Sequence, residues 1–308
     1  TLVITPSRTI CEQWQEHFGK LTTIDPDSVS IYRKGIAPTP VTIATYQALT
    51  GSNGATNGLA EVLDQPWGLI IYDEVHSLPA DVFRQSAALQ SIRRLGLTAT
   101  LVREDGRERE VFSLVGPTVY STPWRDLERR GWIAPVDCIE VRITGSKHQE
   151  FTPDRALAAK LRVLKRLLRR HPEEPTLIVA HRLKEVAAAA HLTGGTVITG
   201  ETPIEDRRGL YQDFKDGEIS CLVLSRVANV GVDLPDASVL IQLSGAYGSR
   251  QEEAQRVGRV LRPKPGRSRA TFYTLVTDGS REVEFAARRQ RFLVDQGYRY
   301  RVVGVDSL

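Results

Sequence analysis

The sequence predicts an α/β protein of two domains, each built on a parallel β-sheet flanked by helices. Short apolar, β-branched runs alternate along the chain with segments of helical periodicity, which is typical of βαβ units. The 308 residues are enough for about two domains, each with its own core. Near the middle, residues 116–155 are interrupted by Gly-Pro, Thr-Pro and Thr-Gly-Ser, which indicates a boundary. We therefore expect a first domain over residues 1–122, a linker over 123–155 and a second domain over 156–308.

The expected elements follow from these patterns in chain order. In the first half, the spacing of Ile10, Trp14 and Phe18 predicts a helix over residues 8–18. The strands of that half are expected at 1–5, 41–45, 69–73 and 94–100. In the second half, strands are expected at 176–180, 196–199, 220–224, 239–243 and 270–276, and helices at 155–170, 183–191, 203–216, 250–260 and 281–296.

Composition sets limits on the class of protein. The chain is 41% hydrophobic and 25% charged, which is ordinary for a globular protein, and its net charge of +4 is compatible with polyanion binding without establishing it. The three cysteines lie far apart without metal-ligand spacing, and an odd, unpaired number fits a reducing cytoplasm. No run is apolar and long enough to span a membrane.

The stretch LIIYDEVH, residues 69–76, joins a buried strand to two carboxylates and a histidine. Open α/β sheets bind ligands at the carboxyl ends of their strands. Asp73 and Glu74 point to opposite faces of the strand, so each can have its own role. One carboxylate can hold Mg²⁺, and the other can orient the water that attacks a γ-phosphate. The simpler alternative is a solvated strand end.

Two groups of basic residues stand out in the second half. Arg259 and Arg262, in the stretch QRVGRVLR, share one helix face and suit the charge that develops on a transferring phosphoryl group. The alternative is a surface of unpaired arginines. The predicted helix 155–170 is also strongly basic, and we expect a solvated face there in preference to a DNA contact. Its charges are Lys160, Arg162, Lys165, Arg166, Arg169 and Arg170.

These motifs occur in an order that resembles a known family. DEVH at 73–76, TAT at 98–100 and QRVGRVLR at 255–262 resemble motifs II, III and VI of superfamily 2 helicases. The segment LTATLVRED, residues 97–105, resembles motif III and the "RED" segment of XPB-type DNA helicases. Residues 248–256 and 292–298 are close to the same pattern, so the resemblance covers nearly the whole chain.

The resemblance implies two RecA-like domains that use ATP and Mg²⁺ and bind DNA. Asp73 would hold Mg²⁺–ATP, Glu74 would activate water, and His76 and Gln255 would couple the nucleotide to the domain interface. Arg259 and Arg262 would contact the γ-phosphate, while Gly231 and Asp233 look like the nucleotide-binding motif V. The DNA contacts implied are Thr5, Arg8, Thr45, Arg103, Glu104, Asp105, His181, Arg182, Ser225 and Arg226. For each of the hydroxyls, a simple helix cap is the alternative.

The implied function is ATP-driven 3′→5′ translocation on DNA and opening of duplex or forked DNA, in repair, with a partner protein such as a nuclease. A non-catalytic DNA clamp of the same fold and an RNA-directed motor are the alternatives. The chain has no Gly-x-x-x-x-Gly-Lys-Ser/Thr loop, and we expect that loop upstream of Thr1, on a strand beside residues 69–73. Residues 142–160 look short for the thumb-like insertion of this family.

Overall fold

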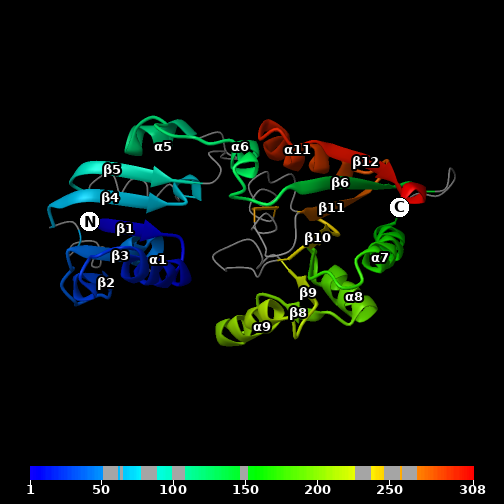
Figure 1. The fold of residues 1–308 in the computed structure, drawn as a ribbon, viewed down its shortest axis with the longest axis horizontal. Helices are drawn as coiled ribbons and strands as arrows, with labels where there is room; N and C mark the ends of the chain where they lie inside the picture. Colours follow the sequence, from blue (N-terminus) through cyan, green and yellow to red (C-terminus); the bar gives the residue numbers. More distant parts are fainter. Residues whose placement is uncertain are drawn as a thin grey trace. The chain divides into compact units, whose positions relative to one another are not determined.

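The computed structural model describes residues 1–50, 62, 65–77, 89–98, 108–145, 152–225, 237–245, 257–258 and 269–308. The chain forms two compact units, Thr1–Tyr120 and Ser121–Leu308 (Figure 1). Each unit contains one sheet in which all paired strands run parallel, so the predicted fold class is confirmed. No helix in these described ranges is long and apolar enough to cross a membrane.

The first unit has a five-stranded sheet in the order β2-β3-β1-β4-β5. Its two faces are covered separately because successive strand residues point to opposite sides. Val3 packs in a cluster with Cys11 of helix α1, while Leu2 and Ile4 pack in a second cluster with Val111 of helix α5. The elements are β1 Leu2–Thr5, α1 Arg8–Leu21, η1 Pro26–Ser28, β2 Val29–Ile31, β3 Val41–Thr45, α2 Tyr46–Thr50, β4 Trp67–Asp73, η2 Val75–Ser77, β5 Ser91–Leu97 and α5 Glu108–Val115.

Strand β4 is paired on both of its edges. Ile71 is in register with Val3 of β1 on one side and with Leu95 of β5 on the other. A strand has only two edges, so the expectation of a further strand beside residues 69–73 is wrong. Among the described strands of this sheet, the outer ones are β2 and β5.

The second unit has a seven-stranded sheet in the order β12-β6-β11-β10-β7-β9-β8. Residues Val163 and Leu167 of α7 and Val186 of α8 pack in one cluster on one face, and Figure 1 shows α8 and α9 on opposite sides of β8 and β9. The elements are α6 Trp124–Arg129, β6 Val136–Ile143, α7 Pro153–Arg170, β7 Thr176–Val179, α8 Leu183–Thr193, β8 Thr196–Ile198, α9 Ile204–Asp216, β9 Cys221–Leu224, β10 Val239–Gln242, β11 Ala270–Thr277, α11 Glu282–Asp295, β12 Tyr300–Gly304 and η4 Val305–Ser307.

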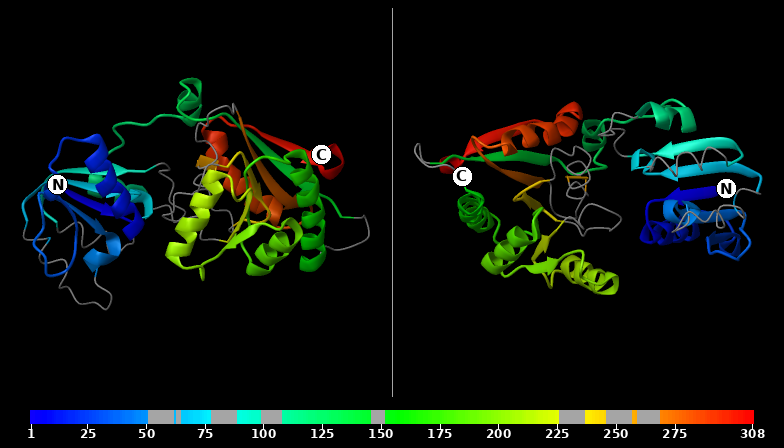
Figure 2. Two further views of the ribbon diagram at one scale, coloured as in Figure 1. Left: turned by 60° about the horizontal axis from the view of Figure 1, so that its bottom comes forward. Right: turned by 180° about the vertical axis from the view of Figure 1, so that it is seen from behind.

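Helix α11 covers the opposite face of this sheet from α7 (Figure 2). In β6, Ile139 and Val141 belong to the α7 cluster. The intervening Glu140 points the other way, and its carboxylate accepts a hydrogen bond from Gln290 of α11. The sheet is therefore buried on both faces, as parallel sheets require.

The expected linker over residues 123–155 is wrong in its central part. It contains α6, and it contains β6, which pairs with β11 over eight residues and with β12 on its other edge. The prolines and glycines that indicated a linker lie in the segments between elements, except for Pro153, which is the first residue of α7. Strands β2 and β12 were also not expected, since they are short and their apolar alternation is weak. The helix expected at 250–260 lies outside the described residues except for 257–258. Of residues 142–160, where an insertion was considered, 146–151 lie outside the described residues.

Candidate functional site

The carboxylate of Asp73 is held in a fixed orientation at the end of β4. The indole Nε1–H of Trp14, on α1, donates to its Oδ2 at 2.8 Å. The backbone N–H of Glu74 donates to its Oδ1 at 3.0 Å. The hydroxyl of Tyr46 donates to the backbone carbonyl of Asp73 at 2.7 Å. Burial, and next the negative charge of Asp73, raise the pKa of Tyr46, so this hydroxyl stays a proton donor at neutral pH.

Glu74 turns the chain away from the strand through a strained backbone conformation. Its φ of +50° lies in the left-handed region, which is unfavourable for a residue with a Cβ. Its Oε2 lies 3.3 Å from Nδ1 of His76. That same Nδ1 lies 2.5 Å from the hydroxyl of Thr98, which follows β5. The side chain of His76 is buried, so the three side chains connect the ends of two neighbouring strands.

We expect the strain at Glu74 to lower the free energy of unfolding by a measurable amount. Glu74→Gly should raise the free energy of unfolding above that of Glu74→Gln by roughly 1 kcal/mol, because glycine adopts a positive φ without steric cost. Both variants lose the carboxylate, so its charge does not contribute to the difference between them. Urea unfolding of the two proteins measures the difference.

Glu16, on the exposed face of α1, is the matched control, since its backbone is helical. There the order should reverse, with Glu16→Gly less stable than Glu16→Gln. If Glu74→Gly were the less stable of its pair, the left-handed turn would not be the source of strain.

The predicted DNA contacts of the first unit differ in accessibility. Thr5 is fully buried, and its hydroxyl donates to the carbonyl of Ser7 at 3.0 Å, so it closes the turn into α1. The hydroxyl of Thr45 accepts the N–H of Ala48 at 3.1 Å and caps α2. For both hydroxyls the geometry favours a local structural hydrogen bond over a DNA contact. Arg8 is half exposed and lies 3.6 Å from Glu12 in an exposed ion pair.

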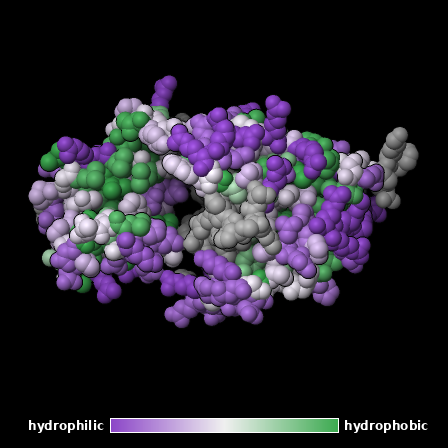
Figure 3. All heavy atoms as spheres, viewed as in Figure 1, coloured by the Kyte–Doolittle hydropathy of each residue, from purple (hydrophilic) through white to green (hydrophobic). Residues whose placement is uncertain are grey.

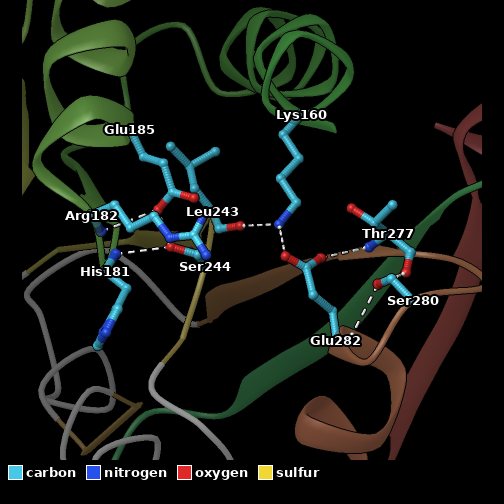
Figure 4. Close-up of polar contacts among 9 residues, drawn as sticks. All are labelled: Lys160, His181, Arg182, Glu185, Leu243, Ser244, Thr277, Ser280 and Glu282. Carbon is cyan, nitrogen blue, oxygen red and sulfur yellow. Dashed lines mark hydrogen bonds and ion pairs between the residues drawn. The ribbon is translucent and has the colours of Figure 1, made fainter. Parts of the chain in front are cut away.

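In the second unit, the ends of β7 and β10 are tied together by one carboxylate (Figure 4). The N–H of His181 donates to the hydroxyl of Ser244 at 2.8 Å. That hydroxyl in turn donates to Oε2 of Glu185, which also accepts the N–H of Arg182 at 3.2 Å. The side chain of Arg182 is exposed, whereas Ser225 at the end of β9 is buried and its N–H donates to Ile198 at 3.1 Å.

A second polar network lies beside the first, around the buried ammonium of Lys160 (Figure 4). Its Nζ donates to the carbonyl of Leu243 at 2.8 Å and to Oε1 of Glu282 at 2.7 Å. The other oxygen of Glu282 accepts the N–H of Thr277 at 2.9 Å. The network therefore joins α7, the end of β10 and the start of α11.

Lys160 corrects the expectation that all charges of this helix face solvent. Only 3% of the residue is exposed, because position 160 lies one turn before the core residues Val163 and Leu164 on the same helix face. Burial alone would raise the pKa of Glu282, but the Lys160 ammonium and the hydrogen bonds from Lys160 and Thr277 outweigh it and lower the pKa.

Lys160→Met should destabilise the second unit by roughly 1–3 kcal/mol, since it leaves the Leu243 carbonyl and the Glu282 carboxylate without their buried partner. Because the pKa of Glu282 is lowered on folding, the wild-type contribution is present above the unfolded pKa of the carboxyl and is lost as pH falls through the folded pKa. The variant should lose less stability over that range. Urea unfolding across a pH series measures both effects.

Lys184→Met is the matched control, because Lys184 pairs with Asp154 in an ion pair whose side chains are 72% and 79% exposed. It should change stability little. If Lys160→Met and Lys184→Met lowered the free energy of unfolding equally, the Lys160 network would not stabilise the unit more than an exposed ion pair does.

Trp14, Tyr46, Glu185, Ser244, Lys160 and Glu282 hold the strand ends but were not singled out from the sequence for that role. Trp14 was counted only as an apolar helix position, and nothing local distinguishes it from Phe18. The remaining predicted site residues lie outside the described residues, namely Arg103, Glu104, Asp105, Arg226, Gly231, Asp233, Gln255, Arg259 and Arg262. In the part of the chain that the structure describes, no group of three His, Cys, Asp or Glu side chains is arranged to hold a metal ion.

Two family models match the chain, one in each half. The model of the ERCC3/RAD25/XPB C-terminal helicase family matches residues 127–307, and that of the res subunit of type III restriction enzymes matches residues 1–103. Proteins named DNA 3'-5' helicase XPB from Kineococcus radiotolerans and Mycobacterium tuberculosis are 46% and 44% identical over 100% of this chain. The chain spans 58% of the length of each.

A solved structure shares the fold across both units. The fragment of a putative HsdR subunit of a type I restriction enzyme from Vibrio vulnificus has a TM-score of 0.66 at 21% identity. The match covers 99% of this chain and 57% of that chain. At this identity the likeness concerns the fold alone.

Proposed function

Because the chain belongs to the ERCC3/RAD25/XPB helicase family, we propose that the complete protein is an ATP-dependent DNA helicase that moves 3′→5′ and opens duplex or forked DNA. The observation that carries this proposal is the end of β4, where Asp73 is oriented by two N–H donors and is followed directly by Glu74. A role in DNA repair with a partner protein such as a nuclease is part of the same proposal.

The two carboxylates have different surroundings and therefore suit different tasks. Asp73 is fixed by Trp14 and by the backbone, so its oxygens keep one direction without rearrangement. Glu74 lies off the strand with 30% of its side chain exposed, and its Oε2 is near His76. In this proposal Asp73 orients the metal–nucleotide complex, and Glu74 accepts the proton of the water that attacks the γ-phosphate.

The chemistry of Asp73 fits Mg²⁺, since a carboxylate oxygen is a hard ligand and this ion usually takes one or two carboxylates together with water and substrate phosphates. When bound, Mg²⁺ would neutralise the charge that builds up on the phosphate oxygens. Tyr46 and Trp14 would keep the carboxylate aimed at it. Gln255, Arg259, Arg262, Gly231 and Asp233, outside the described residues, are proposed to complete the nucleotide site.

The DNA contacts are proposed for exposed residues that follow strands. Arg8 follows β1 and Arg182 follows β7, so both lie at the carboxyl edge of their own sheet. Guanidinium groups at these positions suit backbone phosphates and do not read bases. An RNA-directed motor and a clamp without ATPase activity remain outcomes that the experiments below would reveal.

In the complete protein, Glu74→Gln should lower DNA-stimulated ATP turnover by a factor on the order of 10² to 10⁴, because the general base is lost. ATP binding should stay within about twofold, since the neutral side chain has the same shape. Turnover is measured by phosphate release and binding by fluorescent-nucleotide titration.

Glu16→Gln serves as the control, because Glu16 is paired with Lys20 on the exposed face of α1 and should not affect turnover. Turnover within tenfold of wild type in Glu74→Gln would reject the proposed role of Glu74. Wild-type protein that binds DNA without hydrolysing ATP would identify the clamp, and stimulation by RNA alone would identify the RNA motor.

Trp14→Phe should raise the Mg²⁺ concentration needed for half-maximal ATPase activity by about tenfold, since a hydrogen bond to a charged group contributes roughly 1.5 kcal/mol. Phe18→Leu is the matched control, because the Phe18 ring lies 5.7 Å from the Trp14 ring and has no N–H to donate to Asp73. If both variants shift the Mg²⁺ requirement alike, Trp14 acts through packing and not through its N–H.

A further inference from the structure

A hollow of about 700 Å³ in the second unit is bordered by four arginines. Arg142 comes from β6, and Arg155, Arg162 and Arg166 come from α7. The three helix positions are separated by seven and four residues, so they lie on one face of α7. Ala158, Ala159, Val163 and residues 304–306 also line the hollow, and Asp306 is the one carboxylate among the lining residues.

The positive charge of this hollow is only partly neutralised. Arg142 pairs with Glu140 and lies 3.3 Å from Asp278, and Arg166 donates to the carbonyl of Leu308 at 2.8 Å. Within the described ranges, Arg155 and Arg162 make no ion pair with a carboxylate, and both are exposed. In the space-filling view, hydrophilic side chains gather where α7 lies in Figure 1 (Figure 3).

The hollow lies at the edge of the sheet where the strands end. It includes Ile143, the last residue of β6, and Gly304, the last residue of β12. All strands of this sheet are parallel, so His181 after β7 and Ser225 after β9 lie along the same edge. Strands β6 and β7 are three places apart, which corresponds to about 14 Å, or roughly four nucleotides of a duplex strand.

We propose that this arginine hollow, formed by Arg142, Arg155, Arg162 and Arg166, binds the phosphodiester backbone of a nucleic-acid strand. The proposal rests on the proposed function and adds a contact that none of the helicase-like motifs contains. Guanidinium groups bind phosphate oxygens through two parallel N–H bonds, and Arg155 and Arg162, which make no ion pair within the described ranges, are available for such bonds. From Arg155 to Arg166 the row extends about 16 Å along the helix, which suits successive phosphates better than a single small anion.

The test compares two double variants of the complete protein that remove equal charge from the same helix. Arg155→Ala/Arg162→Ala removes the two arginines without a carboxylate partner, and Lys165→Ala/Arg169→Ala removes exposed charges that do not line the hollow. Binding of a fluorescein-labelled forked duplex is measured without nucleotide over a series of salt concentrations. The hollow variant should bind about tenfold more weakly, and the slope of log K against log salt should fall by about two, whereas the control should stay near wild type.

Arg155→Lys/Arg162→Lys keeps the charge and should recover most of the salt slope, with affinity between wild type and the alanine variant. Thermal unfolding checks that all variants are folded. Equal losses in the two alanine variants, or no loss in the hollow variant, would overturn the proposal. Loss of binding to a polyglutamate peptide with unchanged DNA affinity would also overturn it and would indicate an acidic protein partner.

The outcome separates this proposal from the proposed function. Wild-type protein that binds DNA and hydrolyses ATP, together with an unaffected hollow variant, would overturn only the hollow. Wild-type protein that does not bind DNA would overturn both.

Discussion

Every paired strand in the two sheets runs parallel to its neighbour, and this constraint determines where the chemistry of each unit can lie. Parallel strands need a crossover after each strand, so all strands of a sheet end at one edge. That edge holds Asp73 and Thr98 in the first unit, and His181 and Ser244 in the second. The backbone topology alone therefore places residues that are far apart in sequence next to each other at this edge.

Beyond the ends of the strands, where the backbone ladder stops, side-chain hydrogen bonds hold the chain in place. Asp73 is held by the indole of Trp14, 59 residues earlier in the chain. In the second unit Glu185 holds the ends of β7 and β10, and Lys160 holds the end of β10 and the start of α11. The Lys160 network is the costliest of these to break, because its bond to Leu243 is buried and a buried polar atom that loses its partner keeps its desolvation penalty.

Unlike these hydrogen bonds, the left-handed backbone at Glu74 lowers the stability of the fold. A glycine there would relieve the strain but would remove the carboxylate that lies beside His76. Strain at a non-glycine residue persists where the surrounding structure holds it in place, and here the flanking Asp73 and the buried His76 do so. The position is therefore one where a functional side chain and local stability conflict.

The sequence by itself determined the parallel α/β class, most of the helices and strands, and the acidic pair with its histidine. These follow from local periodicity and from short motifs whose residues are adjacent in the chain. Only the tertiary structure decided that Lys160 is buried, that the hydroxyl of Thr5 faces inward, and that β6 lies within a sheet and not in a linker. The reason is that these contacts join residues far apart in the sequence. Lys160 bonds to residues 83 and 122 positions later, and β6 pairs with a strand that begins at Ala270. No window of neighbouring residues contains such information, because burial and partner choice depend on how the sheet brings distant strands together.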